Sequence, residues 1–171
     1  LCNGNSTGSA GVTASGGTGA LTYLWNSTPA QSTASATGLP AGSYTATVTD
    51  ANGCVRNVTA PISQPATAVT ASVSATTNIL CNGNSTGSAG VTASGGTGTL
   101  TYLWNSTPAQ STATATGLIA GSYTATVTDA NGCAKTATVS ITEPATAVSV
   151  SVTATTNVLC NGNSTGSADV T

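Results

Sequence analysis

A long internal repeat constrains this chain more than any other feature. The segment Leu1–Gly8 returns unchanged at Leu80–Gly87 and at Leu159–Gly166, so the repeat is about 79 residues long in both cases. Residues 1–79 and 80–158 align without a gap and share 64 of 79 positions. Repetition of this kind favours an array of similar small units over one larger domain. Because the chain starts and stops inside a repeat, we expect a window on a longer tandem array.

The units are expected to meet at two proline segments. Gln64–Thr67 and Glu143–Thr146 each end a stretch of alternating apolar and polar residues, and proline cannot donate a hydrogen bond to a sheet. The predicted units are residues 1–65, which lack their first strand, the complete unit 66–144, and residues 145–171, which hold the first strand and start of a third repeat.

Within the complete unit the apolar residues recur with a period of two. Tyr123, Ala125 and Val127, for example, alternate with threonine, as in a strand with one buried face. Asn131-Gly132 is predicted to be a hairpin turn, because both residues tolerate positive φ. About seven such short strands per repeat predict an all-β fold of tandem immunoglobulin-like β-sandwiches.

The aromatic residues are predicted to form the core of each sandwich. Trp104 lies where a third strand would carry a core tryptophan, and Tyr123 resembles a tyrosine corner at the start of the sixth. Stacking of Tyr102 and Trp104 on a sugar ring is the alternative, but their same-face spacing favours the core. The predicted core aromatics are Tyr23, Trp25, Tyr44, Tyr102, Trp104 and Tyr123.

The five cysteines are predicted to form disulfides in an oxidising, extracellular setting. The chain has no Cys-x-x-Cys pair and no histidine, so a zinc site is not expected. The five cysteines are Cys2, Cys54, Cys81, Cys133 and Cys160. Pairing within a repeat would join Cys2 to Cys54 and Cys81 to Cys133, whereas head-to-tail stacking would join Cys2 to Cys133. A seven-residue strand spans about 23 Å, and a disulfide needs Cα atoms within about 7 Å. That favours stacking, but the stretch Thr155–Gly166 is long enough to carry Cys160 up its sandwich, so both pairings remain open.

Composition excludes several classes of function. The chain has two basic and four acidic residues, no histidine and a net charge of −2. Two basic side chains cannot neutralise a row of phosphates, so no nucleic-acid partner is expected. No apolar run approaches the roughly 18 residues of a membrane span. Nothing pairs a nucleophile with a base, so we predict no enzyme and no catalytic or cofactor-binding residue.

Three local patterns have both a structural and a functional interpretation. Gly83–Gly87 resembles a phosphate loop but lacks its lysine and the following helix, so it is predicted to be a turn. Asp129–Gly132 offers one carboxylate where calcium prefers several, so it is also predicted to be a turn and no metal site is predicted. Asparagines in Asn-x-Ser/Thr triplets are candidate glycosylation sites. They are Asn5, Asn57, Asn84 and Asn163.

The sequence between Cys81 and Pro144 resembles a known repeat family. It contains Cys-Asn-Gly, Leu-Thr-Tyr-Leu-Trp, Gly-Ser-Tyr-Thr-Ala-Thr-Val-Thr-Asp-Ala-Asn-Gly-Cys and Ile-Thr-Glu-Pro, in that order. This combination resembles the SprB-type repeat of large cell-surface adhesins in gliding and related Bacteroidetes bacteria. The resemblance implies a secreted, surface-attached, multi-repeat protein with an adhesive or structural role, and it names no catalytic residue.

The leading functional hypothesis is therefore structural. The chain is predicted to be part of a long extracellular filament or stalk on the cell surface, with neighbouring copies of the same protein as partners. The alternative is an adhesin module whose loops recognise surface glycans. That alternative predicts loops that differ between repeats, and here they are nearly identical.

Overall fold

The computed structural model describes residues 2–171 as thirteen β-strands, and these residues contain no helix. The predicted all-β class is thus confirmed. The strands are β1 (Gly8–Gly11), β2 (Thr22–Trp25), β3 (Ser35–Leu39), β4 (Gly42–Thr49), β5 (Val55–Ile62), β6 (Thr70–Thr77), β7 (Gly87–Ser94), β8 (Thr101–Trp104), β9 (Thr114–Leu118), β10 (Gly121–Thr128), β11 (Ala134–Ile141), β12 (Val152–Thr156) and β13 (Ser167–Val170).

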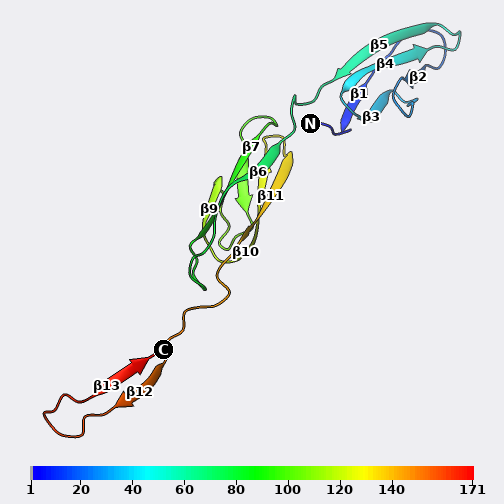
Figure 1. The fold of residues 1–171 in the computed structure, drawn as a ribbon. Coiled ribbons are helices and arrows are strands. Elements are labelled where there is room, and N and C mark those ends of the chain that lie inside the picture. Colours follow the sequence, from blue (N-terminus) through cyan, green and yellow to red (C-terminus); the bar gives the residue numbers. More distant parts are fainter. Residues whose placement is uncertain (1) are drawn as a thin grey trace.

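The strands gather into three bodies that follow one another along one long axis (Figure 1). The first unit holds β1 to β5 and the second holds β6 to β11, while β12 and β13 form a separate hairpin. The N-terminal end lies between the first and second units (Figure 1). The start of the chain is therefore at a junction rather than at the tip of the rod.

The second unit is a β-sandwich of two three-stranded antiparallel sheets. One sheet has the order β6-β7-β9 and the other β11-β10-β8, which makes six strands where about seven were predicted. Strand β6 contacts β11 across the sandwich. The alternation of apolar and hydroxyl side chains puts one face of each strand inside. The buried cluster is Val69, Ile79, Ala89, Val91, Trp104, Ala115, Leu118, Ala125, Val127, Cys133, Ala137, Val139 and Ile141.

The two tryptophans lie at equivalent positions in the two cores, and each side chain is 1% exposed. The Nε1 of Trp104 donates a hydrogen bond to the carbonyl of Thr112 at 2.9 Å, so burial leaves no polar atom unpaired. The Tyr123 hydroxyl donates to the carbonyl of Ile119, four residues upstream, at 3.0 Å. Tyr123 is half-buried, as are the other three tyrosines, Tyr23, Tyr44 and Tyr102.

The turn between β10 and β11 differs from the predicted one. Gly132 has a φ of 81°, but no residue other than glycine has positive φ among residues 2–171, so Asn131 does not adopt it. The amide of Gly132 donates to the carbonyl of Asp129, and the amide of Asp129 donates to the carbonyl of Cys133, both at 3.0 Å. One left-handed glycine after a tight turn is sufficient for this hairpin.

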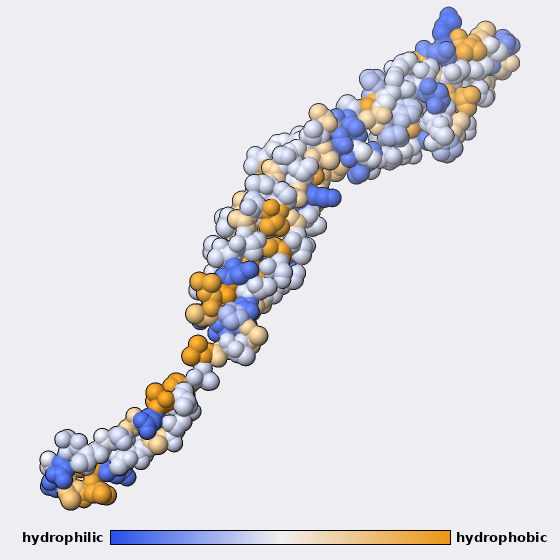
Figure 2. Space-filling model, viewed as in Figure 1, coloured by the Kyte–Doolittle hydropathy of each residue, from blue (hydrophilic) through white to orange (hydrophobic). Residues whose placement is uncertain are grey.

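The first unit has the same plan with one strand fewer. Its sheets have the orders β1-β3 and β2-β4-β5, and no strand of residues 2–171 occupies the position that β6 holds in the second unit. Its core is correspondingly more open: Val12 is half-buried, whereas its counterpart Val91 is 4% exposed. The outer surface of the molecule is mostly of intermediate hydropathy, as expected from its serine, threonine, glycine and alanine content (Figure 2).

Candidate functional site at the junction between repeats

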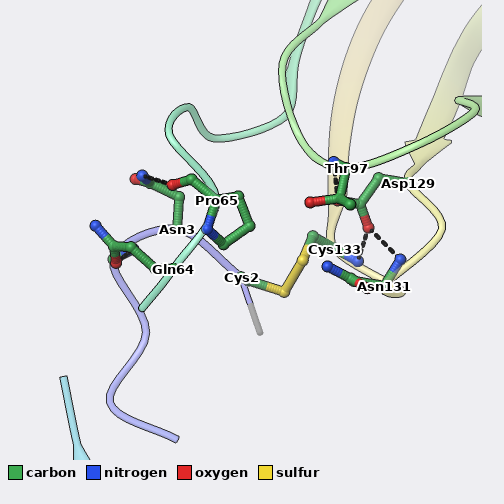
Figure 3. Close-up of a disulfide and its surroundings, with 9 residues drawn as sticks. Cys2, Asn3, Gln64, Pro65, Thr97, Asp129, Asn131 and Cys133 are labelled. Atoms are coloured by element: carbon green, nitrogen blue, oxygen red, sulfur yellow. Dashed lines mark hydrogen bonds between the residues drawn. A yellow bond between two sulfur atoms is a disulfide. The ribbon is translucent and has the colours of Figure 1, made fainter. Parts of the chain in front are cut away.

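A disulfide joins the first unit to the second. Cys2 is bonded to Cys133, 131 residues away in sequence, with a Cα–Cα distance of 5.6 Å (Figure 3). Of the two pairings left open by the sequence, the structure has the one between repeats. The remaining cysteines, Cys54, Cys81 and Cys160, are free and exposed.

Stacking of the units explains this pairing. Cys2 lies just before β1, at the end of the first unit that faces the second. Cys133 lies in the hairpin loop at the facing end of the second unit. Cys54, the counterpart of Cys133, is in the hairpin loop at the far end of the first unit. The length of a sandwich separates it from Cys2, which is too far for a disulfide.

Two hydrogen bonds hold the connecting segment against the end of the first unit. The side-chain amide of Asn3 donates to the carbonyl of Pro65 at 2.7 Å (Figure 3). The backbone amide of Gly4 donates to Oε1 of Gln64 at 2.8 Å. Asn3 and Gly4 directly follow Cys2. The three consecutive residues therefore link the disulfide to the segment Gln64–Pro65, through which the chain leaves the first unit.

The same arrangement recurs one repeat later. The side-chain amide of Asn82 donates to the carbonyl of Pro144 at 2.7 Å, and the amide of Gly83 donates to Oε2 of Glu143 at 2.6 Å. The chain therefore leaves the second unit as it leaves the first. Cys81, next to Asn82, occupies the position in the second unit that Cys2 occupies in the first.

A buried carboxylate shapes the loop that carries Cys133. Asp129 is 5% exposed, and its Oδ1 accepts hydrogen bonds from the amides of Asn131 at 2.9 Å and Cys133 at 2.8 Å. Its Oδ2 accepts one from the amide of Thr97, in the loop between β7 and β8, at 2.8 Å (Figure 3). The carboxylate thereby ties the cysteine loop to a neighbouring loop and presents Cys133 to the junction.

These contacts also set the charge state of Asp129. Burial pushes the pKa of its carboxyl group up, but the hydrogen bonds from Cys133, Thr97 and Asn131 outweigh it and lower the pKa below its ordinary value. At Asp50, its counterpart in the first unit, the bond from Thr18 is the largest cause of a lowered pKa. Both carboxylates thus serve as acceptors for a turn. No group of three or more side chains that could hold a metal ion occurs within residues 2–171.

The other predicted site residues lie outside the junction core. The four candidate glycosylation asparagines, Asn5, Asn57, Asn84 and Asn163, are all exposed. Asn57 lies on β5, whereas the other three lie in the loops that follow Cys2, Cys81 and Cys160. The structure does not gather the four into one patch, since they are distributed along the rod.

A comparison with known families covers part of the junction, including Cys2 and Asn3. A family model described as the SprB repeat matches residues 1–29 and 73–108. These two segments are similar to the SprB repeat. Among curated proteins, none matches the chain. SprB-type repeats are modules of bacterial cell-surface proteins, and a disulfide fits the extracellular location that this implies. Within residues 2–171, no helix is long and apolar enough to cross a membrane.

Two residues of the junction were not predicted from the sequence. Asn3 and Gln64 had no assigned role, although Gln64 was placed at a unit boundary. A signal was available, because an Asn-Gly pair follows Cys2, Cys81 and Cys160, and a Gln-Pro or Glu-Pro pair closes the units that begin with Cys2 and Cys81. Such co-occurrence does not by itself indicate that an asparagine and a proline bond to each other.

Proposed function

We propose that this chain is a stiff, non-catalytic segment of an extracellular filament or stalk on a bacterial cell surface. The observation that carries the proposal is the junction, where the Cys2–Cys133 disulfide adds a second covalent connection to the peptide link at Pro65. A single flexible link between two domains acts as a hinge. Two connections at different points of the facing surfaces oppose bending.

The hydrogen bonds of the junction support the same function. The bond from Asn3 to Pro65 recurs as the bond from Asn82 to Pro144, so the direction of the chain is set at both exits. In a repeat array, each unit contacts only its neighbours, and the overall stiffness depends on these contacts. A junction geometry that recurs at every unit generates a straight or regularly curved rod.

The surface suits a structural role. With four acidic and two basic residues, the rod has little charge repulsion along its length or between neighbouring rods. Its exposed strands are rich in threonine and valine, and unpaired strand edges are templates for pairing with another chain. Neighbouring copies of the same protein are therefore the partners that we propose.

Small-angle X-ray scattering of the oxidised chain tests the stiffness. We expect a rod-like distance distribution for the parent and for the variant Cys81→Ser, which leaves the junction disulfide intact. The variant Cys2→Ser should give a broader distribution, because the junction is then held by one covalent link. A parent chain that scatters as flexible beads, with no difference from Cys2→Ser, would contradict the proposal. Electron cryotomography of the native protein on cells tests the location and the filament itself.

A further inference from the structure

The outer face of the sheet β11-β10-β8 carries an ordered array of threonines. On β10, Thr124, Thr126 and Thr128 alternate with buried alanine and valine. On β11, Thr136 and Thr138 alternate with buried alanine and valine in the same way. Because successive side chains of a strand point to opposite faces of the sheet, these five side chains point away from the core. We call this set of five residues the threonine face.

The pairing of the two strands places the threonines in rows. Strands β10 and β11 pair without interruption over eight residue pairs, with Thr124 opposite Thr138 and Thr126 opposite Thr136. The hydroxyl groups of Thr124 and Thr138 form a hydrogen bond with an oxygen–oxygen distance of 3.1 Å, so both side chains lie on one face. The array therefore repeats at about 5 Å across the strands and at about 6.7 Å along each strand.

The outer face of the opposite sheet also carries hydroxyl side chains, but not in regular rows. The register of β6 on β7 shifts between Val73 and Ala75, and that of β7 on β9 shifts between Gly87 and Ser88. In addition, Gly90 leaves one position of β7 without a side chain. The regular array is therefore a property of β10 and β11 and not of every hydroxyl-rich strand.

The threonine face is uncharged. The second unit, residues 66–144, has three ionic side chains, and none of them lies on this face. Asp129 is buried in its loop, and Glu143 accepts a hydrogen bond from the amide of Gly83. Lys135 lies opposite the buried Val127, so its side chain leaves β11 on the other side of the sheet. Such a face is complementary to a surface that carries no ions.

The face is also stiff and free of aromatic side chains. Threonine is branched at Cβ, so few side-chain rotamers are open to it in a strand, and its hydroxyl and methyl groups are held in place before a ligand arrives. Tyr102 and Tyr123 lie opposite the buried Val127 and Val139, on the core side of the sheet. The face therefore has no ring on which a sugar could stack.

An uncharged, rigid and periodic face suits a ligand that is itself uncharged and periodic. Ice has these properties, because the water oxygens on its prism faces recur at similar intervals in two perpendicular directions. A threonine can place its hydroxyl oxygen at a lattice position and its methyl group in a gap between water molecules. Neighbouring strands twist by about 20–25°, and a face of only two strands keeps the departure from a plane small.

We propose that the threonine face of the second unit binds ice. Its hydroxyl groups order a layer of water at intervals similar to those of the crystal, and this layer joins the ice surface. The inference goes beyond the structural role proposed above, because it gives the rod a binding surface of its own. Where several units carry such a face, their contacts with one crystal add up through avidity.

The first unit has an incomplete version of the same face. Its strand β4 carries threonines at the positions equivalent to those of β10, and the register of β4 on β5 is also unbroken. Strand β5, however, has Asn57 where β11 has Thr136, and Pro61 where β11 has Ser140. We therefore assign the stronger binding to the second unit.

Partition into slowly growing ice tests the proposal on the oxidised 171-residue chain. The solution also contains a globular protein of similar mass that does not bind ice, as an internal standard. We expect the chain to be enriched in the ice fraction relative to this standard, and to inhibit the recrystallisation of ice in a thin frozen film. A chain that the ice rejects as completely as the standard would overturn the proposal.

Two matched variants locate the binding surface. Thr138→Tyr places a bulky ring on the threonine face, whereas Thr92→Tyr places the same ring on the opposite sheet. Both threonines are exposed, and each shares a hydrogen bond of 3.1 Å with a hydroxyl group of the neighbouring strand, so the two substitutions remove the same contact. Thr138→Tyr should lose the enrichment in ice, and Thr92→Tyr should keep it. Equal behaviour of the two variants would overturn the assignment to this face.

Thermal melts by circular dichroism check that the variants are folded. If Thr138→Tyr melts below Thr92→Tyr, Thr136→Tyr repeats the test, because the Thr136 hydroxyl makes no hydrogen bond within residues 2–171 and none is lost. Retention of ice binding by a folded Thr136→Tyr variant would then overturn the proposal. The scattering test of stiffness depends on the junction disulfide, so the proposed function is judged separately from ice binding.

Discussion

Removal of the junction disulfide is the perturbation whose effect the structure predicts most directly. In the double variant Cys2→Ala/Cys133→Ala, the folded units keep their strands and cores. What changes is the unfolded chain, which is no longer closed into a loop of 131 residues. The loop-closure estimate for this separation is about 5 kcal/mol at 25 °C.

The estimate depends little on which part unfolds first. If the second unit alone unfolds, the loop runs from Pro65, which remains bonded to Asn3, to Cys133, and it is half as long. Because the entropy depends on the logarithm of the loop length, the estimate is then still about 4 kcal/mol. For a unit of this size, such a loss corresponds to a fall in Tm of at least about 15 °C.

Thermal unfolding followed by circular dichroism and tryptophan fluorescence measures this shift. Each unit contains one tryptophan, Trp25 or Trp104, at equivalent buried positions. Reduction of the parent with dithiothreitol should reproduce the loss without any change of side chain. The control is Cys81→Ala, which removes the counterpart of Cys2 at a position where the cysteine is free, and it should melt with the oxidised parent. A double variant that melts within about 3 °C of the oxidised parent, well below the expected shift, would refute the loop-closure argument.

Further predictions concern the loops and the core. The pKa of Asp129 is lowered from 3.8 in the folded state, so its carboxylate stabilises the fold fully above that pH, and this stabilisation is lost as pH falls through the folded pKa. Asp129→Asn should therefore lower Tm at pH 7 and flatten the dependence of Tm on pH below about pH 4. Thermal melts across this pH range measure both effects. Trp104→Ala should destabilise the second unit by about 3–5 kcal/mol in urea titration, and a loss below about 1 kcal/mol would contradict its placement in the core. Gly95→Ala and Gly16→Ala both add a Cβ atom at positive φ, but only the Cβ at position 95 also meets the Ala68 carbonyl. Gly95→Ala should therefore lower Tm more than Gly16→Ala does. Equal falls in Tm would contradict this difference between the two units.

Much of the fold was predictable because its signals are local. The alternation of Tyr123, Ala125 and Val127 with threonine identifies a strand with one buried face, and these residues lie in β10. The near-identity of the two copies, 64 of 79 positions, predicts that equivalent segments of both adopt the same structure. The turn at Asn131-Gly132 was located correctly but not in its backbone geometry, because a carboxylate outside the dipeptide holds the loop.

Local sequence was enough to predict the strands and the hydroxyl-rich surface, since these depend on neighbours within a few positions, and the repeat is visible directly in the sequence. The pairing of Cys2 with Cys133 and the bond from Asn3 to Pro65 could be read only from the three-dimensional arrangement. The disulfide depends on how one unit lies against the next, and the Asn3–Pro65 bond depends on how the two ends of the first unit meet. Residues far apart in the sequence meet there, and nothing in their local sequence encodes the distance between them.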